Sequence, residues 1–226
     1  MDFAALQVLH CDNHLLVVHK PAGMPVQADS SGDADLLTLA KQWVGRQFAK
    51  PGAVYLGLVH RLDRPAQGVV VLARTSKAAA RLSAQFRDHT TEKVYEAVVV
   101  GRPEPAHGNC EDWLLPSENS TRVARTGEGQ LARLQYHTLA VAGALAQVQV
   151  VLETGRKHQI RVQLASRGWP VQGDLRYGAA HPLPDKSIAL WAKSLVVDHP
   201  TLGTRMQFDG PTPPGWPFAL AEHHGR

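Results

Sequence analysis

The sequence predicts an α+β fold: one large, mostly antiparallel mixed sheet with flanking helices. Strand-like segments are spread along all 226 residues and are mixed with only a few helical segments, a pattern typical of α+β domains. A hydrophobic fraction of 44% is enough to form a buried core. Neither a repeat nor a low-complexity linker divides the chain, so we expect a single domain over 1–226.

The first elements are predicted as a hairpin and a helix. Two apolar segments, 6–10 and 15–19, flank a tight turn at Asp12 and Asn13, residue types that favour turns. Apolar residues over 36–48 recur at helical spacing behind an Asp cap. Because the hairpin starts almost at the first residue, we expect no separate N-terminal domain.

The central segments are predicted as two strands and a helix. Residues 54–62 are typical of a strand that carries Asp63 at its end. The run 69–73 is apolar throughout, which indicates a strand buried on both faces. Thr75 and Ser76 can cap a helix that continues to about His89.

The second half is predicted to be richer in strands. Alternation over 93–100 puts Tyr95 and Ala97 on one face of a strand. Residues 101–130 are rich in Gly, Pro and polar side chains, which favours irregular structure with at most one short strand. The remaining expected elements are strands at 131–141, 145–153 and 188–197, a helix over 157–167 that ends at Gly168, and a Pro-rich tail over 211–226.

Positive charge gathers in two windows of the sequence. Residues 60–87 hold six Lys or Arg and one acid, and residues 154–167 hold four Lys or Arg and no acid. The rest of the chain has 14 basic and 19 acidic residues, although the net charge is +4. A local excess of this kind is typical of a site that binds a polyanion.

Asp63 is the single acid of the first window and follows His60-Arg61-Leu62 directly, with Arg64 after it. Nearby positive charge favours the ionised form of a carboxyl group, which can act as a nucleophile or a base. The alternative is a surface turn, because Asp and Pro are common in turns and Arg–Asp pairs are common on surfaces.

The second window places Arg156 and Lys157 at the start of the predicted helix. Cations there oppose the helix dipole, at a cost of about 0.3–1 kcal/mol each. A phosphate held by both side chains and the backbone N–H groups would account for them. Alternatively, they point into water or the helix begins later. Arg161 would lie one turn beyond Lys157 on the same face, within reach of a carboxylate on a neighbouring strand.

Several classes of site lack support in the sequence. No apolar run approaches the roughly 20 residues of a membrane span, and the N-terminus lacks a basic segment followed by an apolar one. Cys11 and Cys110 form no CxxC motif. A zinc site at His10, Cys11, Asp12, His14 and His19 is disfavoured, because hairpin alternation sends the histidines in different directions. We expect no metal, no membrane and a reducing cytoplasm.

Five segments, in the same order, resemble the RluA-type pseudouridine synthases, which isomerise uridine in structured RNA. These segments are 12–23, 60–63, 93–97, 154–161 and 173–178. The resemblance covers nearly the whole chain and implies the pseudouridine synthase catalytic-domain fold. It implies ribosomal or transfer RNA as the partner, no DNA, and no cofactor for this redox-neutral reaction. The sequence does not give the oligomeric state, and a monomer is the default. The family often carries an additional N-terminal RNA-binding domain, which we do not expect here.

The resemblance also implies roles for individual residues. Asp63 would attack the target nucleoside, Tyr95 would pack against the base and help to move the C5 proton, and Arg161 would hold Asp63 ionised. The target base must leave its stack at a cost of a few kcal/mol, and Arg61 would fill the gap. The residues expected to bind RNA are His60, Arg61, Arg64, Arg156, Lys157, His158 and Gln159.

Three positions depart from the family pattern. Gln67 stands where Ser or Thr is usual, and Gln163 and Trp191 stand where His is common. These departures bear on the choice of substrate more than on the chemistry. Two other functions remain open from the residues: a non-catalytic RNA-binding protein on this fold, and a phosphodiester hydrolase that would require a metal or a His pair near Asp63.

Overall fold

The computed structural model describes residues 6–218 of the chain. The strands are β1 (Gln7–Cys11), β2 (Leu15–Lys20), β3 (Gly57–Leu58), β4 (Gln67–Ala73), β5 (Glu92–Val100), β6 (His107–Pro116), β7 (Thr121–Ala124), β8 (Gln130–Ala142), β9 (Leu145–Leu152), β10 (Leu190–Asp198) and β11 (Arg205–Asp209). The helices are α1 (Leu36–Gln47), α2 (Ser76–Arg87), α3 (Gln159–Ala165) and the 3₁₀-helix η1 (Leu175–Tyr177). Among these described helices, none has the length and apolar character to cross a membrane.

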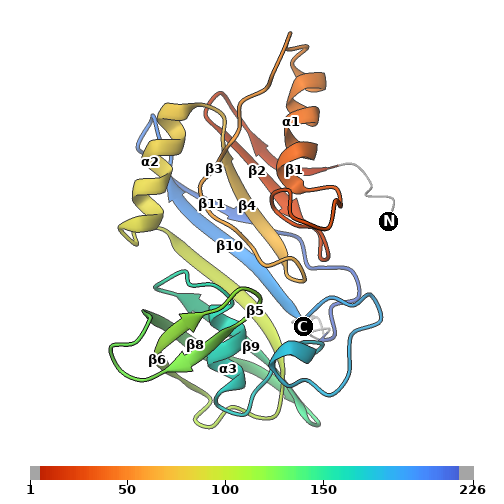
Figure 1. Ribbon diagram of the computed structural model, residues 1–226, viewed down its shortest axis with the longest axis vertical. Coiled ribbons are helices and arrows are strands. Elements are labelled where there is room, and N and C mark those ends of the chain that lie inside the picture. Colours follow the sequence, from red (N-terminus) through yellow and green to blue (C-terminus); the bar gives the residue numbers. More distant parts are fainter. Residues whose placement is uncertain (1–5, 219–226) are drawn as a thin grey trace, which may run out of the picture.

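The strands form one sheet in the order β1-β2-β4-β10-β5-β9-β8-β6-β7, with β11 beside β10 and β3 beside β4. Every pair is antiparallel except β4 with β10. This topology confirms the predicted mostly antiparallel mixed sheet. Figure 1 shows β5 and β10 side by side across the middle of the molecule, where they join the N-terminal hairpin to the strands β6, β8 and β9.

The central strand β4 is buried on both faces. Val70 and Leu72 pack in the core that α1 covers, whereas Val69 and Val71 pack in the core that α2 covers. Because successive side chains of a strand point to opposite faces, a strand covered on both sides is apolar throughout. The apolar run 69–73 is therefore the strand that the sequence predicts.

The N-terminal hairpin and the first two helices confirm their predictions to within about two residues. The carboxylate of Asp35 accepts a hydrogen bond from the Thr38 N–H and caps α1. The hydroxyl of Thr75 accepts one from the Ala78 N–H and caps α2. Each cap satisfies a backbone donor that the first turn leaves free, which fixes where the helix begins.

The predicted strand over 54–62 is wrong, because only Gly57–Leu58 pairs, and it pairs with the end of β4. The cause lies at Val71, whose backbone N–H donates to Nε2 of His60 at 3.0 Å instead of to a strand carbonyl. The imidazole of His60 thus supplies the acceptor that the carbonyl of a neighbouring strand would otherwise supply. Residues 59–66 form a loop, called the 59–66 loop below, and Asp63 lies within it.

The segment predicted as irregular, 101–130, contains the antiparallel pair β6 and β7. Only Cys110 and Leu114 of β6 are fully buried, so its sequence lacks regular alternation. The short strand β11 also has a single buried residue, Phe208, and was not predicted. The Pro-rich tail predicted over 211–226 lies partly outside the described residues.

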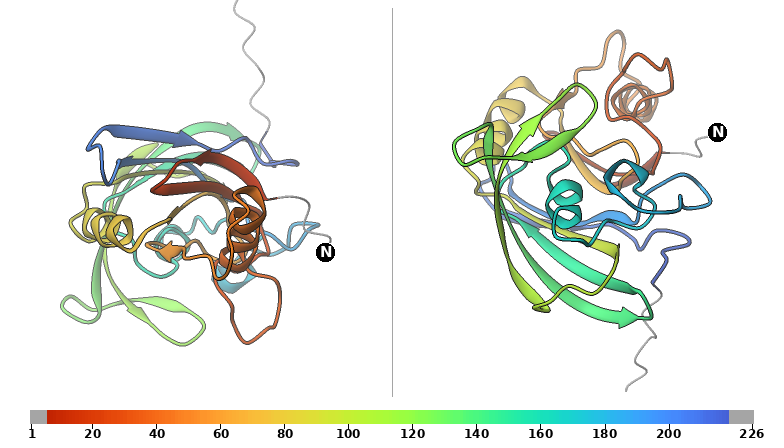
Figure 2. Two further views of the ribbon diagram at one scale, coloured as in Figure 1. Left: turned by 90° about the horizontal axis from the view of Figure 1, so that it is seen from above. Right: turned by 60° about the horizontal axis from the view of Figure 1, so that its bottom comes forward.

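The third helix is shorter than the predicted 157–167. It begins at Gln159 because His158 has a φ of 54°, a left-handed conformation that no right-handed helix contains. Figure 2 shows the sheet curving around α3, which packs against β6, β7 and η1. This curvature brings residues 155–161 toward the 59–66 loop.

Candidate active site

A cleft of about 760 Å³ lies beside the 59–66 loop. Segments far apart in the sequence form its walls: residues 25–29, the 59–66 loop, the C-terminal end of α2, the start of β5 and residues 155–161. Seven Lys or Arg and two Asp line the cleft within the described part of the chain. The two basic windows of the sequence therefore meet in space at one electropositive cleft.

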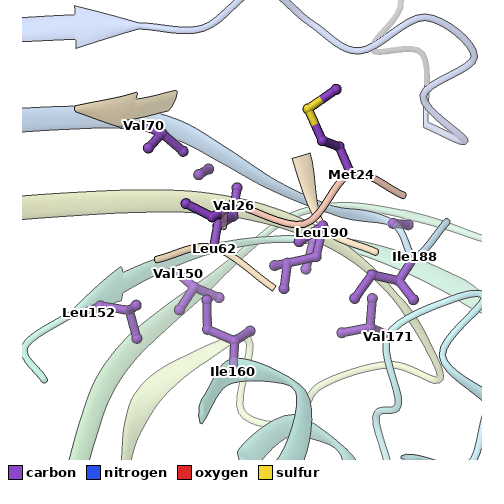
Figure 3. Close-up of a cluster of buried hydrophobic side chains, with 14 of the residues drawn as sticks. Met24, Val26, Leu62, Val70, Val150, Leu152, Ile160, Val171, Ile188 and Leu190 are labelled. Atoms are coloured by element: carbon purple, nitrogen blue, oxygen red, sulfur yellow. The ribbon is translucent and has the colours of Figure 1, made fainter. Parts of the chain in front are cut away.

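Asp63 is held by the residues on either side of it. Leu62 is buried and points into the core beside Val26 and Val150, as Figure 3 shows; burial of a Leu side chain contributes about 1.5–3 kcal/mol. On the other side, the Arg64 carbonyl accepts hydrogen bonds from the Gly23 N–H at 2.8 Å and from Nζ of Lys20 at 3.1 Å. These anchors fix the backbone while the Asp63 side chain stays 25% exposed in the cleft.

One guanidinium serves two carboxylates at the base of the cleft. Nη1 of Arg161 donates to Oδ2 of Asp63 at 3.1 Å. Its Nε and Nη2 donate to both oxygens of Asp174, at 2.6 and 2.9 Å. Burial opposes the charged form of Arg161, but Asp174 and then Asp63 outweigh it and raise its pKa. Asp174 therefore holds the guanidinium with two bonds and Asp63 with one.

His158 approaches the other oxygen of Asp63. Its Nε2 lies 4.0 Å from Oδ1, and its Nδ1 lies 2.8 Å from the hydroxyl of Tyr177. That hydroxyl accepts the Thr121 N–H, so its own proton is free to bond to Nδ1. Burial lowers the pKa of His158 to about 4, despite the charge of Asp63. The imidazole is therefore neutral at pH 7. When the Tyr177 hydroxyl donates to Nδ1, the N–H of the ring is on Nε2, facing Asp63.

Tyr95 lines the same cleft from β5. Burial, and next the negative charge of Asp63, raise the pKa of its hydroxyl. The group is therefore a phenol rather than a phenolate at neutral pH. It offers an aromatic ring together with a hydrogen-bond donor on the wall of the cleft.

The predicted RNA-binding residues divide into two groups. Arg61 is exposed at the cleft, and Arg156 and His158 also line it. Gln159 lines the cleft as well but is buried, and its side chain bonds to Thr154, the Arg156 N–H and the Arg133 carbonyl. It fixes the turn before α3, and its contact with RNA stays a prediction.

Two further predictions are altered by hydrogen bonding. Arg64 lines the cleft but pairs with Asp29 and Asp33, and so ties the segment before α1 to the 59–66 loop. Nε2 of His60 accepts the Val71 N–H, and its ring stacks on that of Phe86 with the centroids 4.6 Å apart. Their RNA contacts stay predictions.

The predicted phosphate site at a helix start is not formed as expected. Nζ of Lys157 donates to the carbonyls of Ser117 and Glu118, and Nε of Arg156 donates to the carbonyl of Leu131. Because α3 begins at Gln159, Arg161 does not lie one turn beyond Lys157 on that helix. The reach of Arg161 to a carboxylate is confirmed, although Asp63 lies in a loop.

The three departures from the family pattern lie outside the cleft lining. Gln67 and Trp191 face each other in the parallel pair of β4 with β10, and Gln163 donates to Asp112 at 2.7 Å. Of the residues that invited a zinc site, His10 and Asp12 bond to each other, and Asp12 also bonds to His199, which was not in that set. Within residues 6–218, no group of three or more His, Cys, Asp or Glu is arranged to hold a metal ion.

Sequence reasoning gave no role to Asp174, Tyr177 or Lys20. The first two lie in segment 173–178, which was matched as a string. Only the fold shows that Asp174 holds Arg161 and that Tyr177 orients His158. The signal available in the sequence was the matched segment itself, in which Asp174 follows Gly173.

Several known proteins are similar to this chain in sequence or in fold. A family model described as RNA pseudouridylate synthase matches residues 14–166. The ribosomal large subunit pseudouridine synthase D of Pseudomonas aeruginosa is 33% identical over 232 residues, which cover 96% of this chain and 71% of the relative. The dual-specificity RNA pseudouridine synthase RluA of Salmonella typhimurium is 32% identical over 217 residues, covering 91% and 93%.

A solved structure, human RNA pseudouridylate synthase domain containing 4, has the same fold. It superposes with a TM-score of 0.79 at 25% identity and covers 93% of this chain and 90% of its own. The match includes both halves of the sheet that meet at the cleft.

Proposed function

The chain belongs to the RNA pseudouridylate synthase family, and from this premise we propose that Asp63 is the nucleophile of its reaction. The enzyme is an isomerase that converts uridine in RNA to pseudouridine. The observation that carries the assignment is the meeting of Asp63, Tyr95 and Arg161 in one electropositive cleft, although they come from separate parts of the chain.

The isomerisation moves the ribose from N1 to C5 of the uracil. In the proposed course, a carboxylate oxygen of Asp63 bonds to the sugar as the N1 bond breaks, and the uracil keeps the electron pair of that bond. The uracil turns, C5 bonds to the sugar as the Asp63 oxygen departs, the C5 proton is lost to a base, and N1 takes up a proton, so that the product is an isomer of the substrate. Oδ1 suits the attack because Arg161 bonds to Oδ2.

The neighbours of Asp63 supply orientation and donors. Arg161 holds the carboxylate in one orientation, which lowers the entropic cost of reaching the reactive geometry. Tyr95 offers its ring to the uracil and its hydroxyl as a proton carrier near C5. His158 presents a neutral N–H that can stabilise negative charge on the departing uracil.

RNA binding is proposed to follow the charge of the cleft. The target base must flip out of its stack to reach Asp63, and the exposed guanidinium of Arg61 can stack in the vacancy. If the cleft contacts roughly six phosphates, raising the salt concentration from 50 to 200 mM should lower the RNA affinity about a thousandfold.

We propose ribosomal or transfer RNA as the substrate. The names of the two relatives above support this choice, because one is a ribosomal large subunit enzyme and the other is called dual-specificity. Residues 1–226 would form one catalytic domain that works in the cytoplasm as a monomer, without DNA as a partner and without a cofactor.

The direct test is release of tritium from ribosomal or transfer RNA labelled at uracil C5. The wild-type protein should release it, and Asp63→Asn should not, while it keeps its melting temperature and RNA affinity. Asp209→Asn, an exposed carboxylate on β11, is the matched control and should behave as wild type. Full turnover by Asp63→Asn would overturn the assignment.

A further inference from the structure

Lys93 is a buried cation whose charge has no partner. It lies at the start of β5, lines the cleft, and has 8% of its surface exposed. Within residues 6–218 its ammonium group makes no hydrogen bond and no ion pair. It lies two residues before Tyr95, so both side chains are on the same face of the strand.

Among the described residues, the charge that acts on Lys93 is positive. Burial, and next the positive charge of Arg156, lower its pKa. His60 is also near, and burial lowers the pKa of His60 to about 4, so this imidazole is neutral. Arg156 bonds only to the Leu131 carbonyl and to no carboxylate of the described chain.

An unpaired buried cation destabilises a fold unless a ligand compensates it. The half-buried Arg156 lies beside the same cleft and meets no carboxylate of the described chain. Together the two cations are best compensated by a group with a full negative charge and several acceptor oxygens. A phosphodiester meets both conditions. Lys157 is excluded from this pair because its Nζ is occupied by two carbonyls.

We propose that Lys93 and Arg156 form a phosphate subsite that binds the RNA backbone next to the target uridine. The inference rests on the proposed function. Two residues along a strand span roughly 7 Å, about the length of one nucleotide. The phosphate therefore belongs to the nucleotide at Tyr95 or to its immediate neighbour, and the RNA strand runs from Asp63 toward the end of α2.

The test measures binding of a fluorescein-labelled 12-nucleotide oligouridylate by fluorescence anisotropy from 50 to 300 mM KCl. Lys93→Met should weaken binding roughly 10- to 100-fold at the lowest salt, as expected for loss of a charge-assisted hydrogen bond. The slope of log affinity against log salt should flatten by about 0.7, the value for one phosphate on a single strand. Lys93→Arg should retain the slope. Lys77→Met, which removes an exposed cation of α2 outside the cleft lining, should match wild type.

The stability of the same variants separates a ligand site from a structural role. Lys93→Met removes an unpaired buried charge, so its melting temperature should equal or exceed that of wild type. A lower melting temperature, or an unchanged salt slope, would overturn the subsite. If tritium release still requires Asp63 in that case, the proposed function stands alone. If Asp63→Asn keeps turnover, the proposed function fails independently of Lys93.

Discussion

Substitution of Arg161 should distinguish a contribution to stability from a contribution to catalysis. Its side chain is 4% exposed, and it neutralises Asp174, which is 1% exposed. Within the described structure, the Asp174 carboxylate has no other hydrogen-bond donor. Arg161→Met keeps an unbranched side chain, although a shorter one, and leaves that carboxylate buried and unpaired.

Loss of one partner of a buried ion pair costs roughly 3 to 5 kcal/mol. For a chain of this size, that is a fall in melting temperature of roughly 6 to 20 °C. The deficit should shrink at pH 5, because the stranded carboxyl group can take up a proton. Arg167→Met is the matched control, since its pair with Asp112 is partly exposed and is worth about 1 kcal/mol or less.

The double variant Arg161→Met/Asp174→Asn should regain most of the lost stability, because no buried charge is stranded. Its activity should stay low, since Asp63 still lacks its guanidinium. We expect tritium release roughly 10- to 150-fold below wild type in both variants, from loss of one charge-assisted hydrogen bond. Recovery of activity together with stability would refute the reasoning and reduce Arg161 to a structural residue.

Three further predictions use other neighbours of Asp63. Tyr95→Phe should bind oligouridylate as wild type does but lose turnover in the tritium assay; full activity would mean that the hydroxyl has no part in the chemistry. Tyr177→Phe should lower kcat with little change in KM, because His158 loses the bond that selects its tautomer; equal activity would remove this relay. The free energy of unfolding in urea should fall by about 2 kcal/mol for each of His158 and His60 between pH 7 and 4.5. The sign follows from their lowered folded pKa values of about 4, since the unfolded chain takes up these protons first; a flat profile would contradict the burial of both rings.

The elements predicted well are those whose signals are local. Asp35 and Thr75 cap helices through residues only three positions away, and the apolar run of β4 reports burial on both faces. The 59–66 loop could not be predicted in this way. Its course depends on the imidazole of His60 bonding to Val71, a contact between a side chain and a strand that no periodicity expresses.

The candidate site shows the same division between local and distant causes. The resemblance named Asp63 and Arg161, and the structure confirms that they meet; their catalytic roles stay predictions. Asp174 received no role because its value depends on a guanidinium on another element. Gln159 is predicted as a polar RNA contact, and in the structure its amide oxygen accepts hydrogen bonds within the turn at the start of α3.

The charges of the cleft are arranged so that affinity and reactivity depend on different residues. At its base, Arg161 is shared by two carboxylates, so little positive charge is left to quench the attacking oxygen of Asp63. Elsewhere in its lining, the described cations that meet no carboxylate are Arg61, Lys93, Arg156 and Lys157. A single cluster of cations around Asp63 would attract RNA but also make its carboxylate a poorer nucleophile. Separation of these four cations from the ion pairs of Arg161 removes that conflict. Substitution of the four cations should therefore change the salt dependence of binding, and substitution of Arg161 should change turnover.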